Sequence, residues 1–158
     1  MANNMSEKYV RARARDLHGS LVDIVGVMMA PERDTNMLEM AGLKLERALF
    51  PLLVLVERFG PIGVVDLASR IGRDYTTVSR QISRLEKLGL VARRGSGTDK
   101  RVREAEITSK GKAATDALDI AREKMAVDLF KGWTRSEFDQ LLTLMRKLAD
   151  GMLEAKIG

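Results

Sequence analysis

Residues 64–111 decide the fold, and they read VVDLASRIGRDYTTVSRQISRLEKLGLVARRGSGTDKRVREAEITSKG. Apolar residues recur at a spacing of three or four in the first part, which predicts a short amphipathic helix that Gly72 ends. A second helix is predicted from about residue 75 to residue 88, and Gly89 closes it. The apolar side chains of this second helix fall on one side and must face a core: they are Val78, Ile82, Leu85 and Leu88.

Two short strands are predicted after the second helix. They are LVARR (90–94) and VREAEIT (102–108), and the stretch RGSGTDKRVR (94–103), rich in glycine and basic residues, joins them. This connection is long for a tight hairpin, so its tip is expected to project into solvent. A short helix, a glycine turn, a second helix and a β-hairpin are the element order of a winged helix-turn-helix.

The rest of the chain is predicted to be helical, so the fold class is mainly α with a small β-hairpin wing. Pro51 predicts a kink or a break within one of these helices, and the residues around 30–36 are predicted to form a loop. Apolar residues near a period of 3.6 predict the helices at 8–29, 43–58, 109–131 and 134–153.

The last helix has a strong start signal. Thr134 and Glu137 have the spacing of a capping box, in which each residue satisfies a backbone N–H of the other. Trp133 and Phe138 are spaced for a hydrophobic staple across the same start. We therefore expect this helix to begin at residue 134 or 135.

The excess positive charge lies in one third of the chain. Residues 60–111 contain eleven Lys or Arg and six Asp or Glu, a net charge of +5, which equals the formal charge of the whole 158-residue protein. The remaining residues carry sixteen of each sign. A basic segment on a neutral scaffold indicates a polyanionic partner, and chance solvated charge is the alternative.

The outward face of the second helix is suited to DNA. It carries hydroxyl and cationic side chains and no carboxylate, whereas an ordinary solvated face mixes both signs. A helix in the major groove needs donors for phosphates and base edges, and a carboxylate there would be repelled. The alternative is a surface helix without a partner. The outward residues are Thr76, Ser79, Arg80, Ser83 and Lys87, with Arg84 on the flank.

The connection between the strands has the features of a DNA-binding wing. Gly95 and Gly97 allow its tip to bend, and Arg101 is long enough to reach into a minor groove. Asp99 is expected to accept a hydrogen bond from Arg101 or from loop amides and so hold the arginine in position. The alternatives are that Asp99 is a plain turn residue and that the loop is only a flexible connector.

On these residues the chain resembles the multiple antibiotic resistance regulator (MarR) family of winged helix-turn-helix transcriptional regulators. The resemblance is clear over about 42–111 and rests on helix pattern alone at both ends. The matching motifs are DLA (66–68), TTVSRQISRLEKLGLV (76–91), the wing DKR (99–101), the IT..G that opens the following helix (107–111) and, upstream, GLKLERALFPLLVLVERFGP (42–61).

The resemblance implies a dimeric repressor on a palindromic operator, a homodimer whose first and last helices interlock. The domains are then an N-terminal dimerisation helix (1–35), a winged helix-turn-helix domain (36–110) and C-terminal dimerisation helices (111–158). It also implies contacts with double-stranded DNA from Thr76, Thr77, Ser79, Arg80 and Arg84 of the helix and from Arg101 of the wing in the minor groove, with Asp99 as its support. Ser83 of the outward helix face and Lys100 of the basic wing complete the predicted DNA-binding residues.

Family members respond to small aromatic acids, to oxidants through a cysteine, or to zinc. This chain has no cysteine and a single histidine, His18, which excludes a thiol switch and argues against a zinc site. No cofactor or metal is predicted. A small organic effector in a crevice between the dimer arm and the winged lobe remains, as does the absence of any ligand. His18 and Arg47 are the candidate ligand-binding residues; the alternatives are a surface histidine and a salt-bridged arginine.

Other functional classes fit less well. An enzyme is not expected, because the sequence has no phosphate-binding glycine loop, nucleophile elbow or His/Cys/Asp cluster. The main alternative is a non-specific architectural DNA-binding protein, which would share the basic wing but would not need a polar helix face. No stretch is apolar for the length of a membrane span, and residues 1–15 lack the apolar core of a secretory signal, so we expect a cytoplasmic protein.

Overall fold

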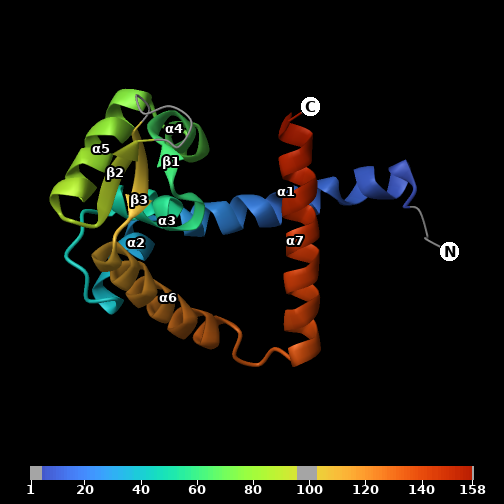
Figure 1. Cartoon of the computed structure of the whole chain (residues 1–158). Coiled ribbons are helices and arrows are strands. Elements are labelled where there is room, and N and C mark those ends of the chain that lie inside the picture. The colour runs from blue at the N-terminus through green and yellow to red at the C-terminus, as the bar shows by residue number, and fades with distance from the viewer. Residues whose placement is uncertain (1–4, 96–102, 158) are drawn as a thin grey trace. The chain divides into compact units, whose positions relative to one another are not determined.

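The computed structural model describes residues 5–95 and 103–157 (Figure 1). The chain divides into two compact units, Met1–Asp119 and Ile120–Gly158. The first unit contains the winged helix-turn-helix that the sequence predicts. The second contains the end of one long helix and the whole of the last helix.

Three helices and a small sheet form the body of the first unit. The sheet is antiparallel in the order β1-β3-β2, and Arg93 of β2 lies opposite Ala105 of β3. The predicted hairpin is confirmed, and β1 is an addition to it, because two residues are too few to show an alternating pattern. The elements are α3 (Phe50–Phe59), α4 (Val64–Ile71), α5 (Tyr75–Lys87), β1 (Ile62–Gly63), β2 (Val91–Gly95) and β3 (Arg103–Ile107).

The core of the first unit lies between these helices and the sheet. Leu88, the fourth residue of the predicted apolar stripe of α5, is the C-cap residue and is 43% exposed, so the prediction that it faces the core is wrong. Burying a Val, Leu or Ile side chain contributes about 1.5–3 kcal/mol. The remaining three residues of that stripe therefore anchor α5 firmly. The fully buried side chains include Leu52, Leu53, Val56, Leu67, Val78, Ile82 and Leu85.

The N-terminal segment forms two helices. The long helix α1 (Glu7–Met28) matches the prediction, and none of its residues is buried. The shorter α2 (Pro31–Met40) occupies most of the segment predicted as a loop, so that prediction is wrong. Pro31 stands in the first turn, where its fixed φ suits a helix, and Met37 and Leu38 are buried.

The helix predicted at 43–58 is interrupted. A single 3-10 turn, η1 (Arg47–Leu49), precedes α3, and residues 43–46 are not helical. Pro51 falls in the first turn of α3, where its missing N–H costs no hydrogen bond. The predicted break near Pro51 is confirmed, because α3 begins there. The prediction of one continuous helix from residue 43 is wrong.

A three-residue turn joins α4 to α5. Gly72 has a φ of 67°, in the left-handed region that glycine favours. The backbone N–H groups of Gly72 and Arg73 both donate to the carbonyl of Ala68. Asp74 then caps α5, and its Oδ1 accepts a hydrogen bond of 2.8 Å from the backbone N–H of Thr77. The turn thus fixes the residue at which α5 begins.

The start of α6 (Ser109–Leu129) is fastened to the end of α5. Thr108 Oγ1 donates to the Gly89 carbonyl at 2.6 Å and accepts from the Gly111 N–H at 3.0 Å. A Cβ at Gly111 would lie 2.0 Å from the Leu90 carbonyl oxygen. The IT..G motif therefore has a physical reason: threonine bridges the two segments and glycine lets their backbones meet.

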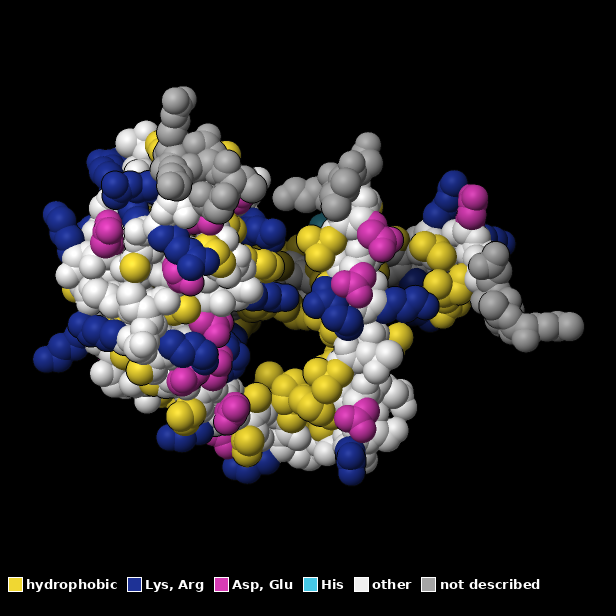
Figure 2. All heavy atoms as spheres, viewed as in Figure 1, with side chains coloured by type: hydrophobic (Ala, Val, Ile, Leu, Met, Phe, Trp, Pro, Cys, Tyr) yellow, Lys and Arg dark blue, Asp and Glu magenta, His cyan; other side chains and the backbone are white. Residues whose placement is uncertain are grey.

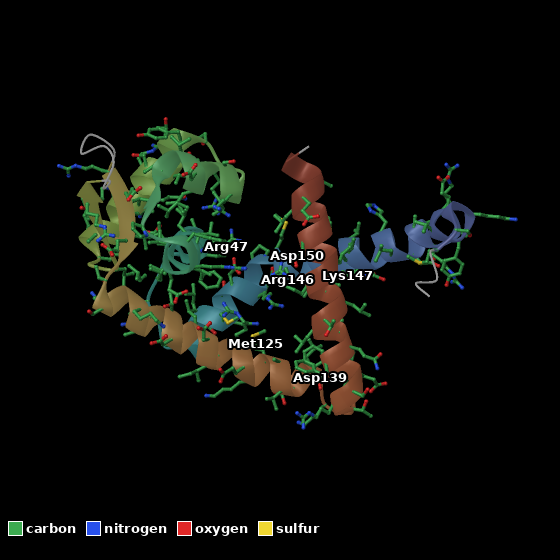
Figure 3. The ribbon with its side chains drawn as sticks, turned by 45° about the vertical axis from the view of Figure 1, so that its right-hand side comes forward. Arg47, Met125, Asp139, Arg146, Lys147 and Asp150 are labelled. Atoms are coloured by element: carbon green, nitrogen blue, oxygen red, sulfur yellow. The ribbon has the colours of Figure 1, made fainter. Side chains whose placement is uncertain are left out.

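In the second unit, Gly132 separates α6 from α7 (Arg135–Ile157) with a φ of 91°. The capping box is confirmed: Thr134 N donates to Glu137 Oε2 at 2.7 Å, and Glu137 N donates to Thr134 Oγ1 at 3.2 Å. Thr134 Oγ1 also donates to Glu137 Oε2 at 2.8 Å. The two hydrogen bonds that Glu137 accepts from Thr134, first from its backbone and then from its side chain, hold the pKa of Glu137 below its ordinary value. Further along α7, Arg146 and Asp150 pair at 2.8 Å one turn apart (Figure 3).

Aromatic rings pack around the turn between α6 and α7. Trp133 and Phe138 both pack edge-on against Phe130, with ring centroids 5.1 and 4.7 Å apart respectively. Trp133 and Phe138, the two residues predicted to form the hydrophobic staple, thus both contact the ring of Phe130. Hydrophobic side chains gather on the surface where α6 leads into α7 (Figure 2).

Replacing Gly111 by alanine should destabilise the protein by about 2 kcal/mol or more, because the added Cβ forces the start of α6 away from the Leu90 carbonyl. Urea unfolding of the full chain, followed by circular dichroism, measures the change. The control is Gly63→Ala, because a Cβ there meets nothing within 4 Å and should cost less than about 1 kcal/mol. Equal losses in the two variants would rule out the close approach as the cause.

Candidate nucleic-acid interface

Helix α5 presents the predicted DNA-contact residues on its solvent side. Tyr75, the first residue of α5, is 56% exposed and extends this face at its N-terminal end. Recognition helices direct that end toward base edges, so the position of Tyr75 next to the cap residue could have marked it in the sequence. Of the six predicted residues, Thr76, Arg80 and Arg84 are exposed, and Thr77, Ser79 and Ser83 are half-buried.

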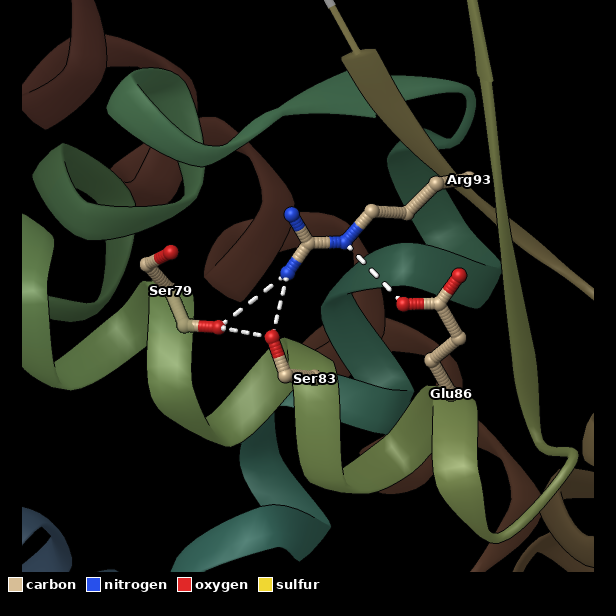
Figure 4. Close-up of polar contacts among 4 residues, drawn as sticks. All are labelled: Ser79, Ser83, Glu86 and Arg93. Atoms are coloured by element: carbon tan, nitrogen blue, oxygen red, sulfur yellow. Dashed lines mark hydrogen bonds and ion pairs between the residues drawn. The ribbon is translucent and has the colours of Figure 1, made fainter.

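The side chain of Ser83, one of the predicted contacts, already has partners within the protein, whereas Ser79 takes part only through its backbone carbonyl. Ser83 Oγ donates to the Ser79 carbonyl at 3.0 Å and accepts from Arg93 Nη2 at 2.8 Å. The same Nη2 also donates to the Ser79 carbonyl at 3.2 Å, and Arg93 Nε lies 3.4 Å from Glu86 Oε2 (Figure 4). Strand β2 is therefore joined to α5 through one arginine whose role no local sequence pattern indicates.

Arg84 is paired with a carboxylate from outside α5. Its guanidinium contacts Glu46, which precedes η1, and each of these side chains is 55% exposed. The expectation that no carboxylate accompanies the outward cations holds for α5 itself but not for its surroundings. Because an exposed ion pair contributes only about 0–1 kcal/mol, a DNA phosphate can replace Glu46 as the partner of Arg84.

Arg73 holds the turn against both of its neighbours. Its Nη1 donates to the Ala48 carbonyl at 2.9 Å and to Gln81 Oε1 at 3.0 Å. This half-buried side chain connects η1, the turn and α5. In the sequence, only the position of Arg73 between the turn glycine Gly72 and the helix cap Asp74 indicates this role.

Asp74 is an acidic group at the N-terminus of α5. Hydrogen bonds from Thr77, first from its side chain and then from its backbone N–H, hold the pKa of Asp74 below the ordinary value of 3.8. The positive charge of Arg80 acts in the same direction. The carboxylate is therefore ionised at neutral pH, and it stabilises the positive end of the helix dipole.

The predicted wing residues Asp99, Lys100 and Arg101 lie outside the described residues, so their roles stay predictions. The structure does describe β2 and β3, the two strands on either side of these residues. Arg94 of β2 pairs with Glu106 of β3, with Arg94 Nε 3.2 Å from Glu106 Oε2. This pair lies within the ribbon formed by β2 and β3.

The two candidate ligand residues line different surface hollows. His18 lines a hollow of about 400 Å³ along α1, together with Tyr9 and Leu17. Arg47 stands at the start of η1 (Figure 3) and lines a hollow of about 420 Å³ that also includes Leu43. Neither hollow contains both residues, so each remains a separate prediction.

The relatives of this chain are regulators of transcription. The sequence model of the MarR family matches residues 45–102. The uncharacterized HTH-type transcriptional regulator YxaD of Bacillus subtilis (strain 168) is 35% identical over 106 residues, which are 65% of this chain and 74% of YxaD. The chain belongs to the MarR family. It is a MarR family transcriptional regulator with a DNA-binding winged helix.

Solved structures show the same fold. The crystal structure of MarR superposes with a TM-score of 0.70 at 22% identity, covering 99% of this chain and 97% of that one. A MarR family regulator from Listeria monocytogenes, complexed with 26mer DNA, superposes with a TM-score of 0.67 at 26% identity, covering 85% of this chain and 89% of that one. The winged helix fold that the sequence predicts is thereby confirmed.

None of the helices in residues 5–95 and 103–157 is long and apolar enough to cross a membrane. The same residues contain no group of three or more His, Cys, Asp or Glu side chains placed to hold a metal ion.

Asp74→Asn should remove an acid-dependent part of the stability and retain the cap, because asparagine caps helices as well as aspartate does. The folded pKa of Asp74 is lowered, so its charge stabilises the fold fully above the ordinary pKa of 3.8 and less as the pH falls through 3.8 toward the folded pKa. The free energy of urea unfolding, measured for both proteins from about pH 7 to about pH 3, should show a difference that narrows at the acid end. A difference independent of pH would count against this role.

Proposed function

We propose that this MarR family protein is a sequence-specific repressor that binds a palindromic operator as a homodimer, with α5 in the major groove. The observation that carries the proposal is the outward face of α5, where Thr76, Arg80 and Arg84 are exposed. Arginine can donate two hydrogen bonds to guanine, and threonine can reach bases or phosphates. In the wing, Arg101 enters the minor groove with Asp99 holding it.

The terminal helices supply the dimer interface in this proposal. Helix α1 buries none of its residues within the chain, and hydrophobic side chains lie on its surface (Figure 2). Helix α7 likewise exposes several large apolar side chains. Apolar stripes of this length need a covering partner, and a second copy of the chain offers the same stripes with two-fold symmetry. The exposed apolar residues include Leu17, Val25 and Met28 of α1 and Leu142, Leu144 and Met145 of α7.

A small aromatic or anionic effector completes the proposed repressor. The imidazole of His18 or the guanidinium of Arg47 would pair with the carboxylate of such a ligand. Titration of the protein–DNA complex with benzoate and related aromatic acids tests this, with His18→Ala and Arg47→Ala as the variants that should lose the response.

Selection of bound sequences from random DNA tests the proposed function itself. A dimeric regulator should return a two-fold symmetric motif with half-sites about 10 bp apart. That motif should bind about 10³-fold or more tightly than random DNA. A non-specific architectural protein would return no motif, and this outcome would refute the proposal.

Arg80→Ala should weaken operator binding by about 1–3 kcal/mol and relax the preference at one position of each half-site. The reason is that Arg80 is an exposed cation on the outward face of α5. Arg135→Ala is the matched control, because it removes the same charge from a side chain of α7 that is 95% exposed. If Arg135→Ala weakened binding as much as Arg80→Ala, the effect would be one of net charge alone.

Glu46→Gln should tighten DNA binding several-fold and make its salt dependence steeper, because it frees Arg84 to neutralise a phosphate. Fluorescence anisotropy titrations at several salt concentrations measure both effects. Glu57→Gln is the control: Glu57 of α3 pairs with Lys112 of α6 at 3.7 Å in the same unit, and neither residue belongs to α5. A gain of equal size in the two variants would show that net charge, and not the release of Arg84, is responsible.

Deletion of residues 134–158 should produce monomeric or aggregated protein that no longer binds DNA, because it removes the apolar stripe of α7. Sedimentation velocity of the deletion and of the full chain measures the change in mass. A soluble dimer that retains full DNA affinity would show that α7 is not part of the interface.

A further inference from the structure

Arg93 connects the two parts of the molecule that the proposed function brings to DNA. It belongs to strand β2, and all of its contacts in Figure 4 are with α5. We propose that Arg93 is a positioning residue for DNA recognition: it sets the orientation of α5 relative to the ribbon of β2 and β3, and thereby the sequence specificity of binding. This inference rests on the proposed function as a specific DNA-binding regulator.

The acceptors of Arg93 lie along two turns of one helix. Its Nη2 is 2.8 Å from Ser83 Oγ and 3.2 Å from the Ser79 carbonyl, and its Nε is 3.4 Å from Glu86 Oε2. The guanidinium is a planar, rigid fork. Because the fork meets successive turns of α5, it constrains both the separation of strand and helix and the rotation between them.

The surroundings of Arg93 differ from those of a cation that binds phosphate directly. Only 19% of its side chain is exposed, and its Nε is buried without hydrogen-bond geometry to any acceptor, so that the Glu86 contact is an ion pair only. The adjacent Arg94 is 55% exposed and pairs with Glu106 inside the ribbon. Successive strand residues face opposite sides, which gives the chain a matched pair of arginines with different roles.

Loss of orientation should affect specific and non-specific binding unequally. Hydrogen bonds to base edges require donor–acceptor distances of about 2.7–3.2 Å. Attraction to phosphates extends over a Debye length of about 8 Å at physiological salt. A displacement of α5 against the ribbon by about 1 Å therefore breaks base contacts and leaves the phosphate attraction nearly unchanged.

The experiment compares Arg93→Lys with Arg94→Lys, both of which keep the charge. Affinity is measured for the selected operator and for random DNA, at several salt concentrations. Arg93→Lys should weaken operator binding about ten-fold or more, change random-DNA binding by less than about two-fold, and leave the salt slope unchanged. Arg94→Lys should change neither affinity by more than about two-fold.

A double-variant cycle separates positioning from direct contact. Ser83→Ala removes one acceptor of Arg93 without changing any charge, and it should lower operator affinity but not random-DNA affinity. If Ser83 acts through Arg93, adding Ser83→Ala to Arg93→Lys should cause little further loss. If the losses add in full, Ser83 contacts DNA independently and the proposal is overturned on that point.

Other outcomes decide the remaining questions. Equal losses of operator and random-DNA affinity in Arg93→Lys, or no loss at all, overturn the inference. If Arg93→Lys does not fold, as judged by its thermal melt, Arg93→Gln replaces it in the same cycle, and adding Ser83→Ala must again cause little further loss of operator affinity. A wild-type protein without any operator preference overturns the proposed function itself, whereas a preference that Arg93→Lys retains overturns only the role of Arg93.

Discussion

The burial of Val78, Ile82 and Leu85 is the constraint on which the DNA-facing surface depends. Each of these side chains has no exposed area, and all three lie on one side of α5, so the helix can pack on the core in only one rotation. Thr76 and Arg80 point toward solvent as a result of this packing. The packing that stabilises the winged unit therefore also directs its functional face.

Polar contacts hold the two ends of α5 in place. At the N-terminal end Asp74 caps the helix, and Arg73 ties the preceding turn to η1. At the C-terminal end Lys110 Nζ donates to the Leu88 carbonyl at 2.8 Å, beside the Thr108 bridge. Each such contact contributes little by itself. An isolated helix of 13 residues is marginal in water, so α5 depends on this framework for its persistence.

Local pattern made much of the fold predictable, and long-range contacts limited what could be predicted of the site. The helices α4 and α5 follow a clear period, and Gly72 marks the turn between them. Helix α2 escaped prediction because a proline in a polar segment indicates a turn as readily as a helix start. Glu46 meets Arg84 across 38 positions and Arg93 meets Ser79 across 14, and no spacing rule links residues so far apart. The outward direction of Thr76 and Arg80 was therefore predictable, whereas the hydrogen bond between Ser83 and Arg93 was not.

Protection of guanine N7 from methylation tests the central claim most directly, because N7 lies in the major groove and is an acceptor for arginine. The measurement uses the selected operator saturated with the full-length protein. We predict protected guanines in two clusters about one helical turn apart, one for each α5 of a dimer. An operator whose backbone is covered while every N7 remains reactive would contradict the account, since α5 would then not lie in the major groove.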